Sequence, residues 1–513
     1  MTLKSQLYLL LSVIGISTAQ LLLNGKLTKI DSSSTNNLQK REHLQFHLDY
    51  EQDTYFATTL NIGTPPQSIT VLFDTGSADT WLMSSSNPFC QSNFDSNPNP
   101  DSIRYNNTPI GGKTIDCSAI KTFHSAHSSS FQLDNDKRFY IQYEDKTFAD
   151  GKWAKETFHV NGVAITDVTF GLAEEATTPL GGVFGIGFER RESVTGYDNA
   201  PNKYYNNFPK ILKNENIIDT VAYSLSLMDD NSSILFGSVD KNGYKGDLVT
   251  FPMINMYPTA VSNPATLSLT IQGVGAKKAS QCNFETFMSV KYPVLLDSGS
   301  TLISAPSLIS DKMAAFVGAT WSEADGIYVF ECPDKKKLLD TTFTFDFGDI
   351  DIGVGLADLI LPPQDDSNTC AFGILRGDNE FILGDSFLKS TYVVYDLDNY
   401  LISMGKINDD TNSSNDDFVS IPKDGHIPGA KIATAEPWKT YDSFTVTSDI
   451  YASSKTKCPN TPTVIASVAK NANIKSNTDV IEKKPVRLVT KIETVSKTNY
   501  STVKVCPTGK PGN

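Results

Sequence analysis

Short apolar runs separated by clusters of Gly, Pro, Asn and Asp fill the chain between residues 55 and 406. Runs of this length, bounded by turn-forming residues, are typical of β-strands, and long amphipathic helical periods are scarce. The pattern therefore predicts a mainly antiparallel, all-β architecture. The clearest predicted strands cover residues 55–62, 68–73, 139–143, 223–227 and 392–397.

The start of the chain has a different pattern. Residues 1–19 contain Lys4, an apolar run over residues 7–16 and small residues at the end, the features of a cleaved secretory signal. A membrane-spanning helix needs about 20 apolar residues, so we expect a signal peptide and an extracellular protein, free or held in the periplasmic space or cell wall, without a membrane span. Residues 20–41 end in Lys40 and Arg41. This dibasic pair predicts a short propeptide, and hence a zymogen, cut by a dibasic processing protease; two solvated charges are the alternative.

The composition shifts to Asp, Asn, Ser, Thr and Lys after residue 408. This predicts a C-terminal extension over residues 408–513, either extended or a small β appendage. Of the formal net charge of -14, residues 452–513 contribute +8 and the preceding residues -22. An acidic body repels phosphate backbones, which argues against nucleic-acid binding. The basic tail is either a solvated segment or a means of retention in a cell wall.

An internal repeat carries more information than the composition. Residues 71–77 (VLFDTGS) recur as residues 294–300 (VLLDSGS), with only apolar-for-apolar and Ser-for-Thr changes. Each copy is followed by an apolar-apolar-Gly element, which ends at Gly185 after the first copy and at Gly384 after the second. Two features that recur in the same order predict two related lobes. We place these lobes at residues 42–240 and 241–407.

Each copy of the repeat can deliver one carboxylate to the end of a buried strand. If Asp74 and Asp297 meet across a pseudo-two-fold axis, the two carboxyls cannot both ionise readily, and the pair holds one proton. The ionised member can then take a proton from water while the neutral member donates a hydrogen bond to a peptide carbonyl. The predicted chemistry is peptide-bond hydrolysis with no cofactor and no metal.

These segments resemble the pepsin-like aspartic proteases over residues 55–406. The matching pieces are residues 73–77 (FDTGS), Trp81, residues 296–300 (LDSGS), the two apolar-apolar-Gly elements and residues 382–387 (ILGDSF). The resemblance implies a bilobal pepsin-like fold with pseudo-two-fold related lobes. It also implies an aspartic endopeptidase whose catalytic residues are Asp74 and Asp297 and whose partner is a peptide or protein substrate.

The resemblance further assigns supporting roles around the two Asp residues. Thr75 and Ser298 would cross-link the two active loops, and Ser77 and Ser300 would bond the outer carboxylate oxygens. Gly185 and Gly384 would form structural turns beside these loops. The residues implied as active-loop support are Thr75, Gly76, Ser77, Ser298, Gly299 and Ser300.

The family covers its substrate with a hairpin flap, and residues 139–147 fit that place. Tyr143 would pack over the substrate and hydrogen-bond Trp81, with Asp145 at the tip. The family usually has Gly beside this Asp, whereas this chain has Glu144 and Lys146. Leu72 and Val183 fall where the family lines its primary apolar pocket, and a plain core role is the alternative for both residues.

The chain contains seven cysteines, which a secreted protein would mostly pair. Neighbourhood in the sequence suggests three disulfides and leaves Cys282 over; the pairs are Cys90 with Cys117, Cys332 with Cys370 and Cys458 with Cys506. Four sequons permit N-glycosylation, at Asn106, Asn231, Asn412 and Asn499.

Within the family, residues 74–79 (DTGSAD), the short pro-segment and the spacing of Cys332 and Cys370 resemble secreted yeast enzymes of the candidapepsin and barrierpepsin type. The extension favours the barrierpepsin type, which degrades a peptide mating pheromone. A broad-specificity nutritional protease of the candidapepsin type is the alternative.

Two other classes of protein are weighed against a protease with two Asp residues. A non-catalytic binding protein with this fold would usually have lost an active-loop Asp or Gly, and both copies are intact. A zinc hydrolase would rest on His43 with His47 or His124 with His127, but no His-Glu-x-x-His pattern is present.

Overall fold

The computed structural model describes part of the first of two units, Met1–Thr461 and Pro462–Asn513. The described residues are 44–51, 55–90, 104–105, 108–109, 115, 117, 120–143, 147–178, 180–193, 204–228, 232–281, 283–361, 363, 368–377, 380–409, 417–439 and 450–451. The predicted signal peptide and propeptide, with Lys40 and Arg41, lie outside these residues.

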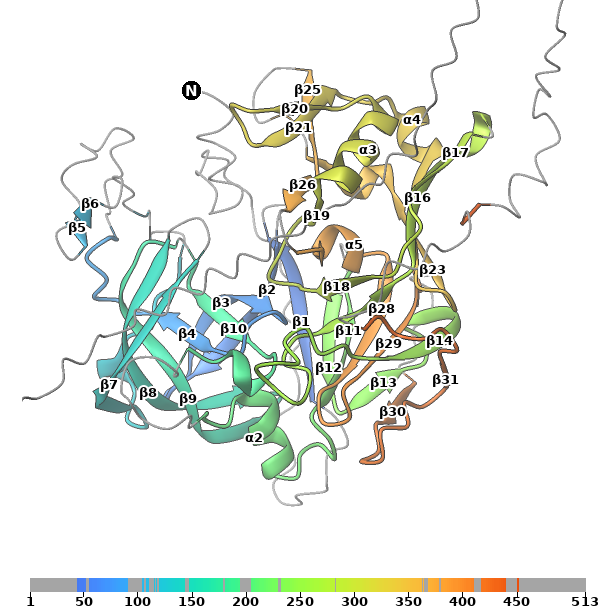
Figure 1. The fold of residues 1–513 in the computed structure, drawn as a ribbon. Coiled ribbons are helices and arrows are strands. Elements are labelled where there is room, and N and C mark those ends of the chain that lie inside the picture. Colours follow the sequence, from blue (N-terminus) through green and yellow to red (C-terminus); the bar gives the residue numbers. More distant parts are fainter. Residues whose placement is uncertain are drawn as a thin grey trace, which may run out of the picture. The chain divides into compact units, whose positions relative to one another are not determined.

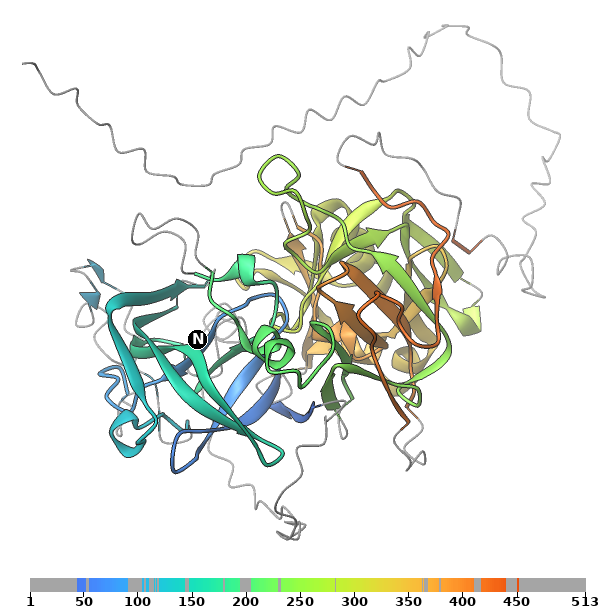
Figure 2. The ribbon, with the colours of Figure 1, turned by 90° about the horizontal axis from the view of Figure 1, so that it is seen from below.

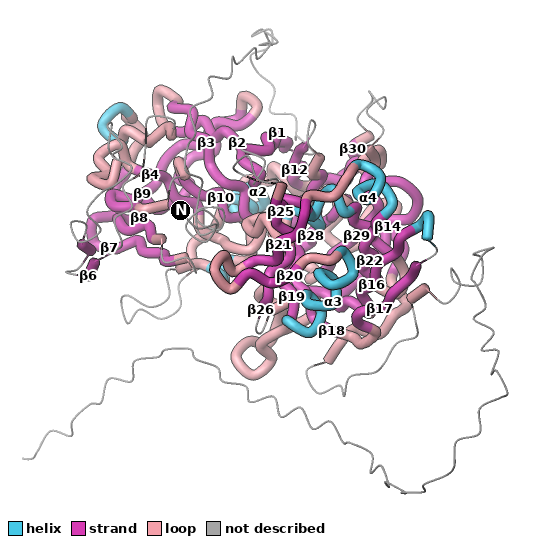
Figure 3. Tube along the Cα trace, turned by 90° about the horizontal axis from the view of Figure 1, so that it is seen from above, coloured by secondary structure: helices cyan, strands magenta, loops and turns pink. Residues whose placement is uncertain are grey.

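Strands make up most of the described chain (Figures 1 and 3). The largest sheet has 14 strands, and its central members come from both halves of the sequence. Their spatial order is β31 (Ala430–Ile432), β14 (Tyr244–Pro252), β29 (Leu401–Ile407), β28 (Thr391–Asp396), β11 (Ala222–Ser226), β12 (Ser232–Phe236), β1 (Leu44–Glu51), β2 (Tyr55–Ile62), β3 (Gln67–Asp74), β10 (Gly182–Gly185), β4 (Thr80–Met83), β9 (Val163–Ala176), β8 (Phe148–Val160) and β7 (Gln132–Gln142).

Smaller sheets complete the second half of the sequence. One has the order β15 (Ser268–Ile271), β18 (Tyr292–Leu296), β27 (Ile382–Leu383), β19 (Ile303–Pro306) and β26 (Ile374–Gly377). Two four-stranded sheets have the orders β17 (Asn283–Met288), β16 (Gly273–Lys278), β22 (Thr341–Asp346), β23 (Asp351–Gly355) and β20 (Thr320–Ser322), β21 (Ile327–Glu331), β25 (Thr369–Phe372), β24 (Ile360–Leu361). The two-stranded pairs are β13 (Ser238–Asp240) with β30 (Phe418–Ser420) and β5 (Arg104–Tyr105) with β6 (Thr108–Pro109).

The described helices are short. The α-helices are α2 (Phe208–Asn214), α3 (Ser307–Val317), α4 (Lys335–Asp340) and α5 (Asp385–Leu388), and the 3₁₀ turns are Ser125–His127, Glu189–Arg191, Ala279–Gln281 and Leu356–Leu359. No helix among the described residues is long and apolar enough to cross a membrane. The predicted all-β fold is confirmed, and each of the five clearest predicted strands overlaps an observed one.

The sequence repeat is also a structural repeat. In the first half, β3 runs parallel to β10, and β10 runs antiparallel to β4. In the second half, β18 runs parallel to β27, and β27 runs antiparallel to β19. In Figure 2 the blue and teal strands of the first half and the yellow and orange strands of the second half form separate groups. Each half therefore presents its Asp-bearing strand in the same local frame, as the bilobal prediction requires.

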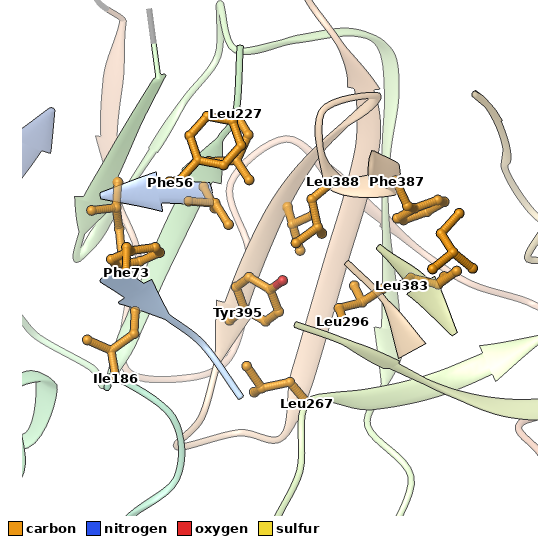
Figure 4. Packing of buried hydrophobic residues seen from close by; sticks show 14 of the residues in the cluster. Phe56, Phe73, Ile186, Leu227, Leu267, Leu296, Leu383, Phe387, Leu388 and Tyr395 are labelled. Atoms are coloured by element: carbon orange, nitrogen blue, oxygen red, sulfur yellow. The ribbon is translucent and has the colours of Figure 1, made fainter. Parts of the chain in front are cut away.

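A shared apolar core lies beneath the two Asp-bearing strands. Phe73, next to Asp74, and Leu296, next to Asp297, are both fully buried. Figure 4 shows Tyr395 of β28 between a group that contains Phe73 and a group that contains Leu296. All of these side chains belong to one cluster of buried residues. The core therefore links the strands that carry the two carboxyls.

Residues 417–439, which we call the strap, pack against the 14-stranded sheet. β30 pairs with β13, and β31 runs parallel to β14. Ile421 is fully buried in a cluster with Leu248 and Tyr392. Near the end of the strap, the Trp438 backbone N–H donates to Thr270 Oγ1 at 2.7 Å. The first part of the predicted extension therefore shares a hydrophobic core with the sheet.

Truncating this buried contact should destabilise the folded chain. We expect Ile421→Ala to lower the free energy of unfolding by about 2–4 kcal/mol, because it removes buried methyl groups and leaves a cavity. Ile432, in the same strap, is 70% exposed, and Ile432→Ala should change the value by less than about 0.5 kcal/mol. Chemical denaturation of both variants measures the difference. Equal effects would mean that the strap does not pack on the sheet in solution.

Candidate active site

Asp74 stands at the end of β3, where the apolar strand stops. β3 lies between β2 and β10, and its inward side chains are buried up to Phe73. Asp74 itself is 8% exposed. Asp297 follows β18 in the same way and is half-buried. The strand thus fixes the backbone on one side of each carboxyl, and the turn that follows fixes it on the other.

The turn after Asp74 directs hydrogen-bond donors at the carboxylate. The backbone N–H of Gly76 donates to Asp74 Oδ1 at 2.7 Å, and that of Ser77 donates to the same oxygen at 3.2 Å. The Ser77 hydroxyl donates to Asp74 Oδ2. Both carboxylate oxygens are therefore oriented by residues of the same turn.

The second turn repeats this arrangement around Asp297. The backbone N–H of Gly299 donates to Asp297 Oδ1 at 2.8 Å, and the Ser300 hydroxyl donates to Asp297 Oδ2 at 2.8 Å. The roles of Gly299 and Ser300 match those of Gly76 and Ser77. Each carboxyl consequently has a Gly N–H donor and a Ser hydroxyl donor, and Asp74 accepts an additional bond from the Ser77 N–H.

Reciprocal hydrogen bonds join the two turns. The Thr75 backbone N–H donates to Ser298 Oγ at 3.1 Å, and the Ser298 backbone N–H donates to Thr75 Oγ1 at 3.0 Å. The Ser298 hydroxyl also donates to the carbonyl oxygen of Phe73 at 3.2 Å. Thr75 and Ser298 are buried. These bonds hold together segments that are 223 residues apart in the sequence.

The two glycines show how closely the carboxyls approach. A Cβ atom added to Gly76 would lie 2.4 Å from Asp297 Oδ1, and one added to Gly299 would lie 2.4 Å from Asp74 Oδ1. Each glycine therefore touches the carboxyl of the opposite turn. No other residue type could occupy either position without moving a carboxyl or the backbone.

Gly185 and Gly384 lie beside the turns. A Cβ on Gly185 would lie 2.5 Å from the carbonyl oxygen of Asp79, and one on Gly384 would lie 2.2 Å from that of Ser300. Next to Gly384, the Asp385 backbone N–H donates to the same Ser300 oxygen at 2.8 Å. These glycines permit the close backbone packing that supports each turn.

Burial and mutual repulsion set the charge of the pair. The pKa of the Asp297 carboxyl is raised to about 7, first by burial and then by the neighbouring Asp74 carboxylate, while hydrogen bonds from Ser300 and Gly299 act to lower it. Two carboxyls this close can share one proton. Below neutral pH the pair keeps a proton that an exposed Asp would lose. The site therefore offers one acid and one base together.

This pKa predicts the alkaline limb of a pH–activity profile. If hydrolysis requires the singly protonated pair, kcat/KM should fall above about pH 7, by about tenfold per pH unit. Between about pH 4 and 7 the native state keeps this proton, whereas the unfolded chain has lost it. The free energy of unfolding therefore falls as the pH rises from about 4 to about 7. Steady-state kinetics from pH 3 to 9 test the limb.

The Ser300 hydroxyl offers a test of the direction of this pKa shift. The Ser300 hydroxyl lowers the pKa of Asp297, so Ser300→Ala should move the alkaline limb to higher pH. A shift to lower pH would contradict the assignment of this limb to the carboxyl pair.

The predicted flap residue Tyr143 lies against Trp81. The Trp81 indole N–H donates to the Tyr143 hydroxyl at 2.7 Å. Tyr143 follows β7, and its backbone N–H donates to the carbonyl oxygen of Thr147, just before β8. Glu144, Asp145 and Lys146 lie outside the described residues. The structure thus brings the Tyr and Trp together on the hairpin β7–β8.

Leu72 and Val183 pack in the same apolar cluster as Trp81 and Tyr143. Val183 is 1% exposed, whereas Leu72 is half-buried. The two residues are paired across β3 and β10. Contact with a substrate remains a prediction for both.

The structure contains two of the three predicted disulfides. Cys90 is bonded to Cys117, and Cys332 to Cys370. Other predicted positions lie outside the described residues, namely Cys458, Cys506, Cys282 and the sequons at Asn106, Asn231, Asn412 and Asn499.

The histidines weighed as zinc ligands are placed only in part. His43 lies outside the described residues. The rings of His124 and His127 stack with their centroids 5.0 Å apart. Among residues that the structure describes, no group of three or more His, Cys, Asp or Glu side chains is placed to hold a metal ion.

Sequence reasoning assigned no role to several buried polar residues near the pair. Asp385 is 1% exposed, and burial raises its pKa well above the ordinary value. Asp79, Glu192 and Tyr205 form a second group, two acids and a phenol joined by hydrogen bonds of Tyr205. Asp79 and Asp385 belong to the matched motifs, but Glu192 and Tyr205 carry no sequence signal that would mark them.

Comparisons with known proteins agree with this geometry. The family model described as eukaryotic aspartyl protease matches residues 54–407. The chain is 51% identical over 442 residues to barrierpepsin of Saccharomyces cerevisiae, covering 85% of this chain and 74% of the relative. It is 36% identical over 446 residues to aspartic proteinase MKC7 of the same yeast, covering 77% and 74%. To aspartic proteinase yapsin-3, also of that yeast, it is 34% identical over 443 residues, covering 84% and 81%.

Proposed function

Because the chain belongs to the eukaryotic aspartyl protease family and is an aspartic-type endopeptidase, we propose that Asp74 and Asp297 are its catalytic pair. The observation that carries this proposal is the reciprocal contact of each carboxyl with the glycine of the opposite turn. Two carboxyls that face each other across these glycines, each oriented by the Ser and Gly of its own turn, can hold one water molecule between them.

The proposed reaction needs only these two side chains and water. The ionised carboxyl accepts a proton from the water, whose oxygen attacks the peptide carbonyl carbon, while the protonated carboxyl donates its proton to the carbonyl oxygen. A tetrahedral gem-diol forms. When the carbon–nitrogen bond breaks, the carboxyl that took the water proton donates it to the leaving nitrogen, and the other carboxylate accepts a proton from a gem-diol hydroxyl, so the pair again holds one proton.

The surrounding residues would orient the substrate. Tyr143, held by the Trp81 indole, would cover the substrate from the hairpin, and Leu72 and Val183 would contribute an apolar wall beside Asp74. Thr75 and Ser298 would keep the two turns at a fixed separation, since their hydrogen bonds run directly between the turns.

We further propose that the enzyme is secreted after removal of residues 1–19 and 20–41, and that it acts on a narrow set of peptides. The high identity to barrierpepsin over most of the chain supports a barrierpepsin-like role. Degradation of a peptide mating pheromone is the specific role we propose, and broad nutritional proteolysis is the alternative. The basic tail would serve retention at the cell wall.

Two assays test these proposals separately. Purified enzyme should cleave an unfolded protein at acidic pH, lose this activity to a statine-type gem-diol mimic and keep it with a metal chelator. Loss of activity to the chelator with resistance to the mimic would overturn the two-carboxyl mechanism. A peptide library read for its cut sites then tests specificity, because a narrow pattern supports the pheromone role and a broad pattern supports nutritional proteolysis.

A further inference from the structure

A second buried acid group lies behind the first catalytic turn. It consists of Asp79, Glu192 and Tyr205, and we call it the Asp79 group. Asp79 is 2% exposed and Glu192 is 3% exposed. Asp79 comes from the motif that begins at Asp74, whereas the other two residues come from segments more than 100 positions later. Burial of two acids in one place requires polar partners.

Tyr205 supplies a hydrogen bond to each acid. Its hydroxyl donates to Asp79 Oδ1 at 2.9 Å, and its backbone N–H donates to Glu192 Oε2 at 2.9 Å. The Ser193 backbone N–H donates to Asp79 Oδ2 at 2.7 Å. Among the described residues, Glu192 Oε1 has no hydrogen-bond partner. Tyr205 is therefore the residue that joins the two acids.

The Asp79 group is connected to the catalytic turn through the backbone. The carbonyl oxygen of Asp79 accepts from the Gly185 N–H at 3.2 Å, and that of Ser77 accepts from the Gly187 N–H at 2.7 Å. Ser77 in turn binds the Asp74 carboxylate. The stretch from Ser77 to Asp79 is thus held by main-chain bonds to β10 and the residues after it, and by the Asp79 carboxyl on its other side.

The ring of Tyr205 reaches the hairpin that carries Tyr143. Its centroid lies 5.1 Å from that of Trp153, and Trp153 packs edge-on against Phe139 at 5.1 Å. Phe139 belongs to β7 and Trp153 to β8. One side chain therefore contacts both the catalytic turn, through its hydroxyl, and the base of the hairpin, through its ring.

Tyr205 contacts two parts of the site, the Asp79 turn and the base of the hairpin. Trp81, two residues after Asp79, donates to Tyr143 on the hairpin. We propose that Tyr205 is a positioning residue for substrate binding, which holds the Asp79 turn and the hairpin in the relative placement that the Trp81–Tyr143 hydrogen bond requires. This inference rests on the proposed role of Asp74 and Asp297.

Charge in the group supports the same inference. Burial raises the pKa of Asp79 and raises that of Glu192 to about 9. The charged and titratable neighbours that act on these two acids are Asp74, Glu189 and Tyr205. At acidic pH Glu192 is therefore a neutral hydrogen-bonding group, and the raised pKa of Asp79 reduces the charge that the buried group must carry.

The test compares Tyr205→Phe with Tyr204→Phe. Tyr204 is the neighbouring half-buried tyrosine, which the Asp79 group does not include. Tyr205→Phe removes the hydrogen bond from the Tyr205 hydroxyl to the Asp79 carboxyl. This loss should raise KM and the inhibition constant of a gem-diol mimic by about tenfold. Rates are divided by the active-site concentration found by titration with a tight-binding mimic, so misfolded molecules do not contribute. Tyr204→Phe should leave both constants unchanged.

A merely structural role gives a different result. In that case the titrated active-site concentration of Tyr205→Phe would fall while KM stayed at the wild-type value, and the proposal would be overturned. A double-mutant cycle with Asp79→Asn adds a second criterion, because coupled residues are not additive. We expect Tyr205→Phe to raise KM much less in the Asp79→Asn background, and equal effects in both backgrounds would also overturn the proposal. Failure here leaves the catalytic pair untouched, since that assignment is tested at Asp74 and Asp297 themselves.

Discussion

Replacing Asp74 or Asp297 by Asn should lower kcat/KM by at least about a thousandfold while the chain remains folded. An amide has nearly the shape of the carboxyl, so its oxygen can still accept from the Gly N–H, and the Ser hydroxyl can accept from the amide NH2 instead of donating. An amide cannot accept the proton of the attacking water, and it cannot share a proton with the opposite carboxyl. The loss is therefore chemical, and it should appear in kcat with little change in thermal stability.

The double variant sharpens this result. Because the two carboxyls act as one unit, the Asp74→Asn, Asp297→Asn chain should be about as inactive as either single variant. Asp247, whose side chain is 61% exposed and pairs with Lys431 on the surface, offers the matched control, and Asp247→Asn should retain wild-type activity. Substantial activity in both single active-site variants would show that the reacting water is bound elsewhere.

The candidate site could be predicted from the sequence because its two halves have the same short sequence motif. Residues 71–77 and 294–300 repeat the strand, the Asp and the donors that follow it. The structure places Thr75 against Ser298, as the resemblance implied. Short-range geometry determines most of these contacts, since a strand that ends in Asp, Thr or Ser, and Gly directs its own N–H groups at the carboxylate.

The Asp79 group could not be predicted in this way. The position equivalent to Asp79 in the second copy of the repeat is Leu302, which is buried. The repeat therefore gives no reason to expect an acid there, and its phenol partner Tyr205 lies 126 residues away. Such a contact depends on how a loop distant in the sequence packs. Neither the spacing of motifs nor the residue composition predicts that packing.

The strap shows a related limit. Composition after residue 408 is polar, and an average over this segment predicts an extended or minor β appendage. Two isolated apolar residues, Ile421 and Ile427, are nevertheless buried against Leu248 and Tyr392. A few well-placed side chains are enough to attach a polar segment to a sheet edge, and an average over the segment does not reveal them.

The glycines of the two turns lead to the second large expected effect. Gly76→Ala and Gly299→Ala should each lower kcat/KM by about a hundredfold or more. A Cβ at either position would lie 2.4 Å from a carboxyl oxygen of the opposite turn, well inside van der Waals contact. The structure must therefore shift, and the atoms that meet the new methyl group belong to the Asp297 or Asp74 carboxyl, the proposed catalytic groups.

The direction of that shift explains why activity should suffer more than folding. Asp297 Oδ2 is held by Ser300 and Asp74 Oδ2 by Ser77, so displacement of either carboxyl breaks hydrogen bonds that orient it and widens the space for the water. Gly353, an exposed glycine in β23, offers the matched control, because its added Cβ would meet the Thr342 methyl at 3.2 Å and the Phe343 carbonyl oxygen at 4.0 Å, both outside the site. Steady-state kinetics and thermal denaturation of the three variants separate the two effects. If Gly76→Ala kept wild-type kinetics, the two carboxyls could not face each other across these glycines, and a shared proton would have no structural basis.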